Sequence, residues 1–231
     1  MPAMTITLHH LENSRSQRVL WLLEELGLPY ELKLYRRDPK TSLAPPELTQ
    51  VHPLGKSPVI TENGNTVAES GAIIEYLLDA HAVRHGKSYL RPAPNTPERL
   101  RFTYWLHFAE GSAMPYLLMK LVFDKVRQAP VPFFVKPVVK TLVGKVNAVF
   151  LMPNIKRQLA YIESELARHA WFAGDEFSAA DIQMSYPVEA AAARIGLAAS
   201  HPNISAWLAG IHARPAYIKA LEVAGPYAVV P

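Results

Sequence analysis

Between Val51 and Gly71 the chain reads VHPLGKSPVITENGNTVAESG, which predicts a β-hairpin leading into a helix. Two short runs rich in β-branched residues, 58–61 and 66–68, flank an Asn-Gly pair at 63–64. Asn-Gly accepts the positive φ angles of a tight hairpin turn. The helix after Glu69-Ser70-Gly71 has an apolar stripe at helical spacing, formed by Ile73, Ile74, Leu77 and Leu78.

A strand–helix–strand unit precedes the hairpin. Residues 4–9 alternate as a strand does, residues 19–26 form an apolar helical run that Gly27 ends, and residues 30–35 alternate again. Such a unit favours parallel strands joined by a right-handed crossover. We expect a loop at 36–45 and at most a short helix at 46–51. The first 86 residues therefore predict a small α/β domain.

The chain beyond the hairpin helix is predicted to be helical. Residues 87–96, which contain Pro92 and Pro94, form the predicted linker. The second domain then runs from 97 to 231, after a first domain at 1–86. The first expected helix starts at Thr96-Pro97-Glu98, with a proline in its first turn, and includes the aromatic-rich residues 100–123. Further helices are expected at 156–169, 178–193 with a bend at Pro187, 203–212 and 216–223. Ser178 and Asp181 have the spacing of a capping box at the start of the expected helix at 178–193.

Composition excludes several classes of protein. The 231 residues include no cysteine, 24 basic and 20 acidic residues, for a formal charge of +4, and 49% are hydrophobic. These values fit a soluble globular chain and exclude a disordered or disulfide-stabilised one. Without cysteine, the protein has no thiol nucleophile of its own and no zinc-thiolate site. The N-terminal residues show no signal-peptide pattern, so we expect a cytoplasmic protein.

Positive charge is concentrated in residues 120–157, where eight basic residues and the single acid Asp124 give a net charge of 8 − 1 = +7. Within this segment, residues 136–150 include a predicted amphipathic helix with lysines on its polar face. We expect a surface helix packed on its own domain, and the alternative is contact with an anionic membrane surface. No nucleic-acid-binding module accompanies these residues, so nucleic acid is not an expected partner.

Ser57 and Pro58 stand where the first hairpin strand begins. A proline cannot donate to a sheet, and it keeps the residue before it extended. If the Ser57–Pro58 bond is cis, the backbone N–H and C=O of Ser57 face outward and can bind the main chain of a peptide ligand. Only about one X–Pro bond in twenty is cis, so the proline alone does not establish this geometry.

Glu69 and Ser70 stand where the following helix begins. The free N–H groups of a helix start and the Ser70 hydroxyl can accept a carboxylate, and the Glu69 carboxylate can accept an ammonium group. Together these groups predict a receptor for an α-amino-acid head group. The alternative is that Ser70 only caps its helix.

A further candidate site is the turn after the first strand, which contains Asn13, Ser14 and Ser16. Ligands of open α/β sheets lie beyond the carboxyl ends of the strands, where this turn is expected. A hydroxyl and free N–H groups at a helix start can bind an anion. Plain capping by Ser14 or Ser16 explains the same residues equally well. His9 and His10 lack a third ligand at a recognisable spacing, so we expect no metal.

Three separated motifs resemble the cytosolic glutathione S-transferases. Residues 14–31 and 52–60, with Ala68-Glu-Ser-Gly-Ala-Ile73, are similar to the thioredoxin-like half of that family, and residues 174–181 are similar to the capping box of its helical half. The likeness covers nearly the whole chain. The long insertion at 120–157 most resembles the fungal and bacterial Gtt1-type members. The resemblance implies a thioredoxin-like α/β N-terminal domain and an all-α C-terminal domain.

The resemblance also implies roles for site residues, with glutathione as the cosubstrate. Ser57 and a cis Pro58 would bind the cysteinyl backbone, Glu69 and Ser70 the γ-glutamyl group, and Lys56 the glycine carboxylate. Ser14 would stabilise the thiolate, ahead of Asn13 and Ser16. A positioned hydroxyl favours the thiolate because a free thiol has a pKa of about 8.5. Some subgroups bind the glycine carboxylate with a pair of basic residues at the positions where Leu43 and Ala44 stand here. Lys40 is the candidate to replace that pair.

The predicted activity is transfer of the glutathione thiolate to hydrophobic electrophiles, as in detoxification, by a homodimer. The alternatives are a glutathione-dependent peroxidase or disulfide reductase, or a non-catalytic binding protein of the same fold. An acceptor pocket is expected between the domains. Four aromatic residues are candidates to line it, although aromatics at helical spacing are more often core: Trp105, Phe108, Tyr116 and Phe123.

Overall fold

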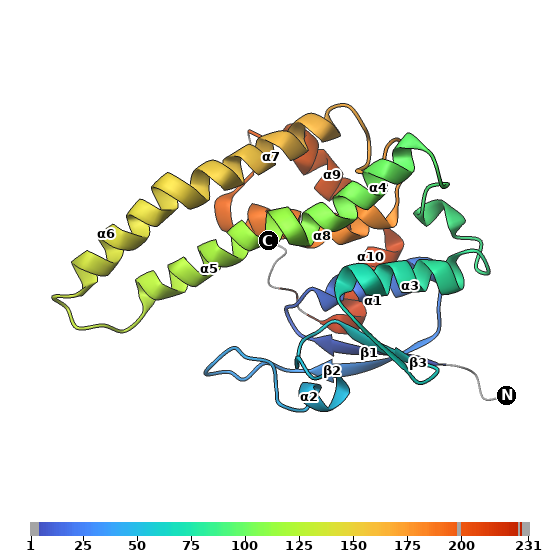
Figure 1. Ribbon diagram of the computed structural model, residues 1–231, viewed down its shortest axis with the longest axis horizontal. Coiled ribbons are helices and arrows are strands. Elements are labelled where there is room, and N and C mark those ends of the chain that lie inside the picture. Colours follow the sequence, from blue (N-terminus) through green and yellow to red (C-terminus); the bar gives the residue numbers. More distant parts are fainter. Residues whose placement is uncertain (1–4, 198–199, 226, 228–231) are drawn as a thin grey trace.

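The computed structural model describes residues 5–197, 200–225 and 227. Its N-terminal half is a four-stranded sheet in the order β2-β1-β3-β4 (Figure 1). Strand β1 (Ile6–Leu11) pairs in parallel with β2 (Tyr30–Tyr35) and antiparallel with β3 (Val59–Glu62), which pairs antiparallel with β4 (Asn65–Ala68). The first strand was predicted at 4–9, and its first residue lies outside the described residues.

The hairpin between β3 and β4 has the predicted turn. Glu62 and Asn65 are paired, and Asn63 and Gly64 between them have φ angles of 53° and 79°. Both angles lie in the left-handed region that the Asn-Gly pair accepts. The turn fixes the register of the two strands, so that Ala68 and the following Glu69 lie opposite the start of β3.

Two helices cover one face of the sheet, as Figure 1 shows: α1 (Ser16–Leu26) and α3 (Ser70–Leu77). The short α2 (Leu48–Val51) lies across the sheet from them. Helix α1 is buried along almost its whole length, because it packs on the sheet and against the helical half. Gly27 ends it at φ 66°, and its N–H donates to the carbonyls of the last turn.

The C-terminal half is all-α, and this confirms the predicted fold class. Two long helical runs are continuous through π-helical turns: α4 (Pro97–Phe108), η3 (Ala109–Ala113) and α5 (Met114–Gln128), then α6 (Lys136–Val146), η4 (Asn147–Leu151) and α7 (Met152–Leu166). Three further helices follow: α8 (Ala179–Ile195), α9 (Pro202–His212) and α10 (Pro215–Ala224). Two short turns, η1 (Leu78–Ala82) and η2 (Ser88–Leu90), precede α4.

Some ends of the long helices differ from the prediction. The predicted start at Thr96-Pro97-Glu98 is confirmed, with Thr96 as the N-cap. The run continues past residue 123 to Gln128, and α7, predicted at 156–169, spans Met152–Leu166. Pro115 and Pro153 each lie just after a π-helical turn. A proline lacks the N–H that a regular helix needs, and the wider turn before it lets the helix continue past it.

Helix α8 begins with the predicted capping box. The Ser178 hydroxyl accepts from the N–H of Ala180 (3.3 Å), and the Asp181 carboxylate accepts from the N–H of Ser178 (2.9 Å). Asp181 is fully buried and also accepts from the Phe172 N–H and the Trp207 indole N–H. The cap therefore connects α8 to α9 and to the loop before α8. Pro187 lies inside α8.

Trp21 of α1 joins the two halves of the molecule. It is fully buried and contacts Phe177 and, edge-on, Tyr217 of α10, with ring centroids 5.7 and 5.0 Å away. Its indole N–H donates to Glu25, which also binds Arg214 at 2.6 Å. The aromatic and ionic contacts fix α1, and the turn before it, relative to the helical half.

Candidate active site

A cavity of about 290 Å³ at the junction of the two halves brings the predicted binding residues together. All five line it: Lys56, Ser57, Pro58, Glu69 and Ser70. Arg15, just before α1, and Glu110, from the π-helical turn η3, complete the lining with His52, Leu54 and Ala68. Because Glu110 belongs to the all-α half, both halves of the chain form this cavity.

The loop before β3 is fixed to the end of β1 by the side chain of Ser57. Its hydroxyl donates to the His9 carbonyl (2.8 Å) and accepts from the Leu11 N–H (3.1 Å). The Ser57–Pro58 peptide bond is cis, as predicted. The register of the sheet pairs His9 with Val59, so Ser57 lies just outside the paired residues. Its backbone is thus at the cavity wall, where a peptide ligand can lie alongside it.

Glu69 and Ser70 differ sharply in their surroundings. Glu69 is exposed and has φ 71°, a left-handed conformation that costs a residue with a β-carbon about 1–3 kcal/mol. Ser70 is buried, and its Oγ accepts from Arg18 (3.0 Å) and Gln183 (3.3 Å). With two donors on the oxygen, the hydroxyl hydrogen of Ser70 is left to donate to a ligand acceptor.

Arginines hold this end of the cavity together, and the sequence analysis did not identify them. Arg18 is 1% exposed and binds the Gln183 carbonyl (2.7 Å), Ser70 and Glu110. Arg15 binds both carboxylate oxygens of Glu110 at 3.0 Å. Arg15 and Arg18 lie three residues apart on α1 and its cap, a spacing that places them on one side of a helix. That spacing is the sequence signal that could have identified the two arginines.

The turn after β1 is well packed in the structure. Ser14 is 5% exposed; its hydroxyl donates to the Leu11 carbonyl (2.7 Å) and accepts from the Ser16 N–H (3.2 Å). Ser16 is fully buried and bonds to His10 Nδ1 (2.8 Å). Asn13 is exposed at φ 48°. The three residues are neighbours of the cavity, but their side chains are not part of its lining.

The two histidines of β1 are structural neighbours of this turn. Burial lowers the pKa of His10 to about 4, so its ring is neutral at pH 7. His9 bonds to the Tyr35 hydroxyl at 2.9 Å, and burial lowers its pKa as well. Within residues 5–197, 200–225 and 227, no three His, Cys, Asp or Glu side chains group closely enough to hold a metal ion.

The charges around the cavity suit a ligand that carries both signs of charge. Lys56 and Arg15 provide positive charge, and Glu69 and Glu110 provide negative charge. A short peptide with free carboxylates and an ammonium group meets this requirement. Lys40, the substitute for the missing basic pair, does not line the cavity.

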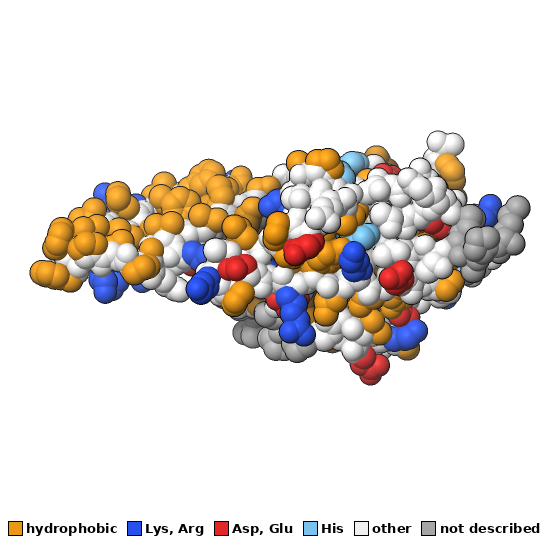
Figure 2. Space-filling view, turned by 90° about the horizontal axis from the view of Figure 1, so that it is seen from below, with side chains coloured by type: hydrophobic (Ala, Val, Ile, Leu, Met, Phe, Trp, Pro, Cys, Tyr) orange, Lys and Arg blue, Asp and Glu red, His pale blue; other side chains and the backbone are white. Residues whose placement is uncertain are grey.

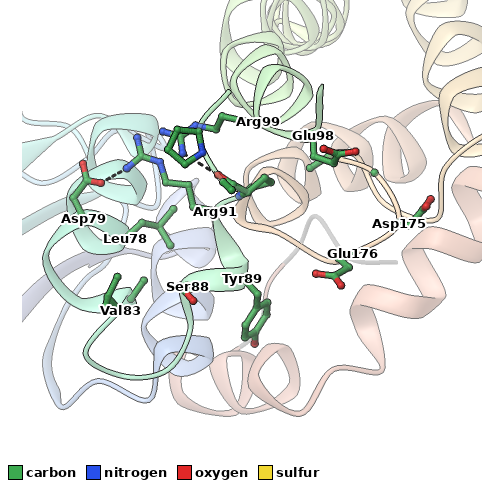
Figure 3. Close-up of a pocket in the computed structure, with 16 residues that line it drawn as sticks. Leu78, Asp79, Val83, Ser88, Tyr89, Arg91, Glu98, Arg99, Asp175 and Glu176 are labelled. Carbon is green, nitrogen blue, oxygen red and sulfur yellow. Dashed lines mark hydrogen bonds and ion pairs between the residues drawn. The ribbon is translucent and has the colours of Figure 1, made fainter. Parts of the chain in front are cut away.

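A larger cavity of about 830 Å³ lies elsewhere, between the linker and the loop before α8 (Figure 3). Its labelled lining includes several carboxylates, Asp79, Glu98, Asp175 and Glu176, and Asp79 is paired with Arg91. It shares no residue with the cavity described above. The candidate acceptor-pocket aromatics line neither cavity: Trp105 is core, and Phe108, Tyr116 and Phe123 pack against it.

Comparison with known proteins identifies the family. Residues 14–80 match "Glutathione S-transferase, N-terminal domain" and residues 127–215 match "Glutathione S-transferase, C-terminal domain". "Glutathione S-transferase 3" of Schizosaccharomyces pombe is 38% identical, over 91% of this chain and 84% of its own. "Glutathione S-transferase 1" of Saccharomyces cerevisiae is 32% identical, over 95% of each chain.

Solved structures agree with these relatives. A glutathione S-transferase from Actinobacillus pleuropneumoniae has a TM-score of 0.77 at 33% identity and covers 97% of this chain and 94% of its own. A glutathione transferase from Phanerochaete chrysosporium, in complex with oxidized glutathione, has a TM-score of 0.70 at 27% identity, with 96% and 97% covered. The chain therefore belongs to the glutathione S-transferase family. It is a glutathione transferase, and glutathione is the cosubstrate of that family.

Proposed function

We propose that the cavity at the domain junction binds glutathione and that the enzyme transfers the bound thiolate to hydrophobic electrophiles. The observation that carries this proposal is the convergence of Ser57, Glu69 and Ser70 on one cavity with charged groups from both halves. Ser70 donates its free hydroxyl hydrogen to the γ-glutamyl carboxylate, and Glu69 accepts from the ammonium group. Lys56 binds the glycine carboxylate.

The backbone of Ser57 pairs with the cysteinyl residue of glutathione, which directs the sulfur toward the turn after β1. We assign Ser14 as the residue that stabilises the thiolate, with Asn13 and Ser16 as alternatives. In the absence of ligand, the Ser14 hydroxyl donates to the Leu11 carbonyl. A rotation about its Cβ–Oγ bond turns that hydrogen toward the sulfur, and the N–H groups at the start of α1 further stabilise the negative charge.

The transfer itself needs no oxidant. The thiol releases its proton to solvent, and the thiolate sulfur attacks the electrophilic carbon. With an aryl halide, the carbon–sulfur bond forms, the carbon–halogen bond breaks, and halide leaves with the electron pair. The protein holds the sulfur close to an apolar acceptor and favours its anionic form.

Two other functions use the same cavity. Reduction of a hydroperoxide or a mixed disulfide would oxidise glutathione instead of conjugating it. A non-catalytic member of the family would bind glutathione and do nothing further, as fold alone allows. Transfer and reduction begin from the same bound thiolate, because the reacting sulfur belongs to the cosubstrate.

Calorimetry with glutathione and three turnover assays test the proposal. We expect binding that Ser70→Ala weakens, and turnover with a chromogenic aryl halide. Activity only on a hydroperoxide or a mixed disulfide would replace transfer by reduction, and binding without any turnover would leave a binding protein. No heat and no thermal stabilisation at saturating glutathione would remove the assignment of the cavity.

We propose further that the enzyme works as a cytoplasmic homodimer in detoxification, with the α/β half of one chain on the helical half of the other. In this proposal residues 1–86 bind glutathione, 87–96 link the halves, and 97–231 carry the acceptor pocket. Light scattering on the purified chain measures the subunit number. A monomer in solution would exclude the dimer.

A further inference from the structure

The end of the helical hairpin α5–α6 projects away from the rest of the molecule (Figure 1). We call residues 118–150 the arm: most of α5, the loop at 129–135, α6 and most of η4. Figure 2 shows the arm largely covered by hydrophobic side chains, with Lys and Arg among them. Its exposed large apolar residues are Leu118, Val122, Val126, Phe133, Phe134, Val138, Leu142, Val149 and Phe150.

These apolar side chains follow the helical repeat, so they form stripes. Leu118, Val122 and Val126 are spaced four residues apart on α5, and Val138, Leu142 and Val149 share one side of α6 and η4. A different side of α6, marked by Val143 at 3% exposed, packs inward. The outer stripes are therefore additional to the packing between the two helices.

The tip of the arm carries the most exposed aromatic pair among the described residues. Phe133 and Phe134 are 83% and 67% exposed and contact each other edge-on, with ring centroids 5.6 Å apart. Exposed phenylalanines at a tip are unusual on a protein that meets only water. Because they lie at the tip, these two side chains would be the first part of the arm to enter an apolar phase.

Positive charge accompanies the apolar stripes. Lys125, Arg127, Lys136, Lys140 and Lys145 are exposed, and within the described part of the chain none forms an ion pair. The single acid of the arm, Asp124, is already bound to Lys120 at 2.6 Å. The arm thus presents apolar and cationic groups together, with no free carboxylate among its residues.

We propose that the arm docks this enzyme on an anionic membrane surface. The phenylalanines and the outer stripes enter the boundary between head groups and acyl chains, and the five cations bind the anionic head groups. The same arm of a second copy fits this patch less well, because a two-fold contact of arm on arm places five unpaired cations against five others. The dimer proposed above pairs the helical half with the α/β half and does not need this contact. This proposal does not depend on the glutathione cavity.

The arm lies on the membrane and does not cross it. The helical run Lys136–Leu166 is long and apolar enough to span a bilayer, and only 17% of its most apolar window is buried. However, Ile155, Leu159 and Ile162 of α7 belong to the hydrophobic core. Insertion of the whole run would expose that core, so only the arm is free to enter the interface.

Vesicle sedimentation of the full-length protein tests the proposal. The probes are vesicles of phosphatidylcholine alone and of phosphatidylcholine mixed with phosphatidylserine, at low and high salt. We expect binding to the mixed vesicles that falls as salt rises, because salt screens the head-group charge. Lys140→Glu/Lys145→Glu should weaken this binding more than about tenfold, since each basic residue near the surface contributes attraction. Phe133→Ser/Phe134→Ser should weaken it at both salt concentrations.

Matched controls separate the arm from general surface properties. Arg36→Glu/Arg84→Glu changes two exposed cations elsewhere, and Val83→Ser/Leu100→Ser changes two exposed apolar residues elsewhere. Both should bind mixed vesicles as the parent chain does. Absence of anionic-lipid binding at low salt overturns the proposal, as does equal loss in the control variants. A change in subunit number in the Phe133→Ser/Phe134→Ser variant, without lipid binding by the parent chain, shows instead that a second copy covers the arm.

Discussion

Arg18 donates a hydrogen bond of 3.0 Å to the hydroxyl oxygen of Ser70, although 52 residues separate them in sequence. The same guanidinium binds the Gln183 carbonyl of α8 and the Glu110 carboxylate of η3. The serine that begins α3, on the α/β half, is thus oriented by contacts that reach into the helical half. Because both acceptor positions of the Ser70 oxygen are occupied, its hydroxyl hydrogen is free to donate into the cavity at the domain junction, where we propose that glutathione binds.

Arg18→Leu should destabilise the protein and weaken glutathione binding together. The substitution removes the side-chain donor to the Gln183 carbonyl, one of two donors to the Ser70 oxygen, and the buried partner of Glu110, which keeps its contact with Arg15. Breaking a buried charged contact costs about 3–5 kcal/mol. Because the Glu110 side chain is 32% exposed, we expect a loss at the lower end of this range, about 3 kcal/mol. Urea unfolding measures the free energy of unfolding. Initial rates at varied glutathione concentration give the KM for glutathione.

The matched control is Arg168→Leu, because that side chain is 69% exposed and its partner Glu165 keeps its contact with Arg101. It should change stability by about 0.5 kcal/mol or less. If Arg18→Leu lost stability but kept the KM for glutathione, the arginine would have no role in orienting Ser70.

Ser14→Ala tests the proposed thiol activation. We expect kcat to fall by about a hundredfold, because one donor to a developing anion contributes that much in comparable sites. The pKa of bound glutathione should rise toward its free value of about 8.5, whereas affinity for glutathione should change little. Titration of thiolate absorbance against pH gives the pKa directly.

Asn13→Ala and Ser16→Ala are the comparisons. Ser16 holds His10 and is fully buried, so its loss should reduce stability more than turnover. A large loss of kcat in Asn13→Ala, with Ser14→Ala unaffected, would move the donor role to Asn13. That outcome agrees with the exposed position of Asn13 and would contradict our assignment of Ser14.

Local sequence signals predicted the parts of this protein that local chemistry controls. Asn63 and Gly64 fix the hairpin through their own φ angles, and Ser178 with Asp181 caps α8 within a single turn. The residues around Ser57 and Glu69 were found because each stands at the start of a strand or helix. In these cases the neighbours in sequence are also the neighbours in space.

Long-range contacts could not be predicted in the same way. Glu110 lies in an aromatic-rich helical run, where nothing nearby marks it as the partner of Arg15 and Arg18. The predicted break between residues 150 and 156 is wrong, because the π-helical turn before Pro153 lets the helix continue. The exposure of the arm also depends on what the rest of the fold leaves uncovered, which a helical wheel does not show.

Two buried groups should make stability depend on pH in opposite directions. Burial raises the pKa of Asp181 from 3.8 to about 6, so the folded state keeps a proton that the unfolded state has lost. Its contribution to stability therefore falls as pH rises from about 4 to about 6. Burial lowers the pKa of His10 from 6.5 to about 4, so its contribution rises with pH over nearly the same interval.

Single substitutions should separate the two contributions, each on the order of 3 kcal/mol. In Asp181→Asn, stability should rise more steeply with pH between 4 and 6.5 than in the parent chain. In His10→Gln it should rise less steeply or fall. Urea unfolding at intervals across this range gives both slopes. Parallel curves for the three proteins would mean that neither group titrates differently in the folded and unfolded states.

Gly55→Ala should damage the loop that carries Ser57. Gly55 has φ 56°, and a β-carbon there would lie 2.9 Å from Cγ2 of Thr49. The left-handed conformation costs alanine about 1–2 kcal/mol, and the contact adds to this because α2 or the loop must shift. We expect a loss of about 2–3 kcal/mol of stability and a raised KM for glutathione, since the shift moves Ser57.

Gly27→Ala isolates the conformational part of this effect. Gly27 has φ 66° and nothing within 4 Å of the added carbon, so only the left-handed cost of about 1–2 kcal/mol should appear, with KM unchanged. Adding Thr49→Ser to Gly55→Ala removes the Cγ2 methyl group that the new β-carbon would contact. The double variant should regain part of the lost stability, and its KM for glutathione should return most of the way to the parent value. If the double variant keeps the raised KM, the contact with Thr49 is not what positions Ser57, and the hydrogen bonds of Ser57 to β1 alone must hold the loop.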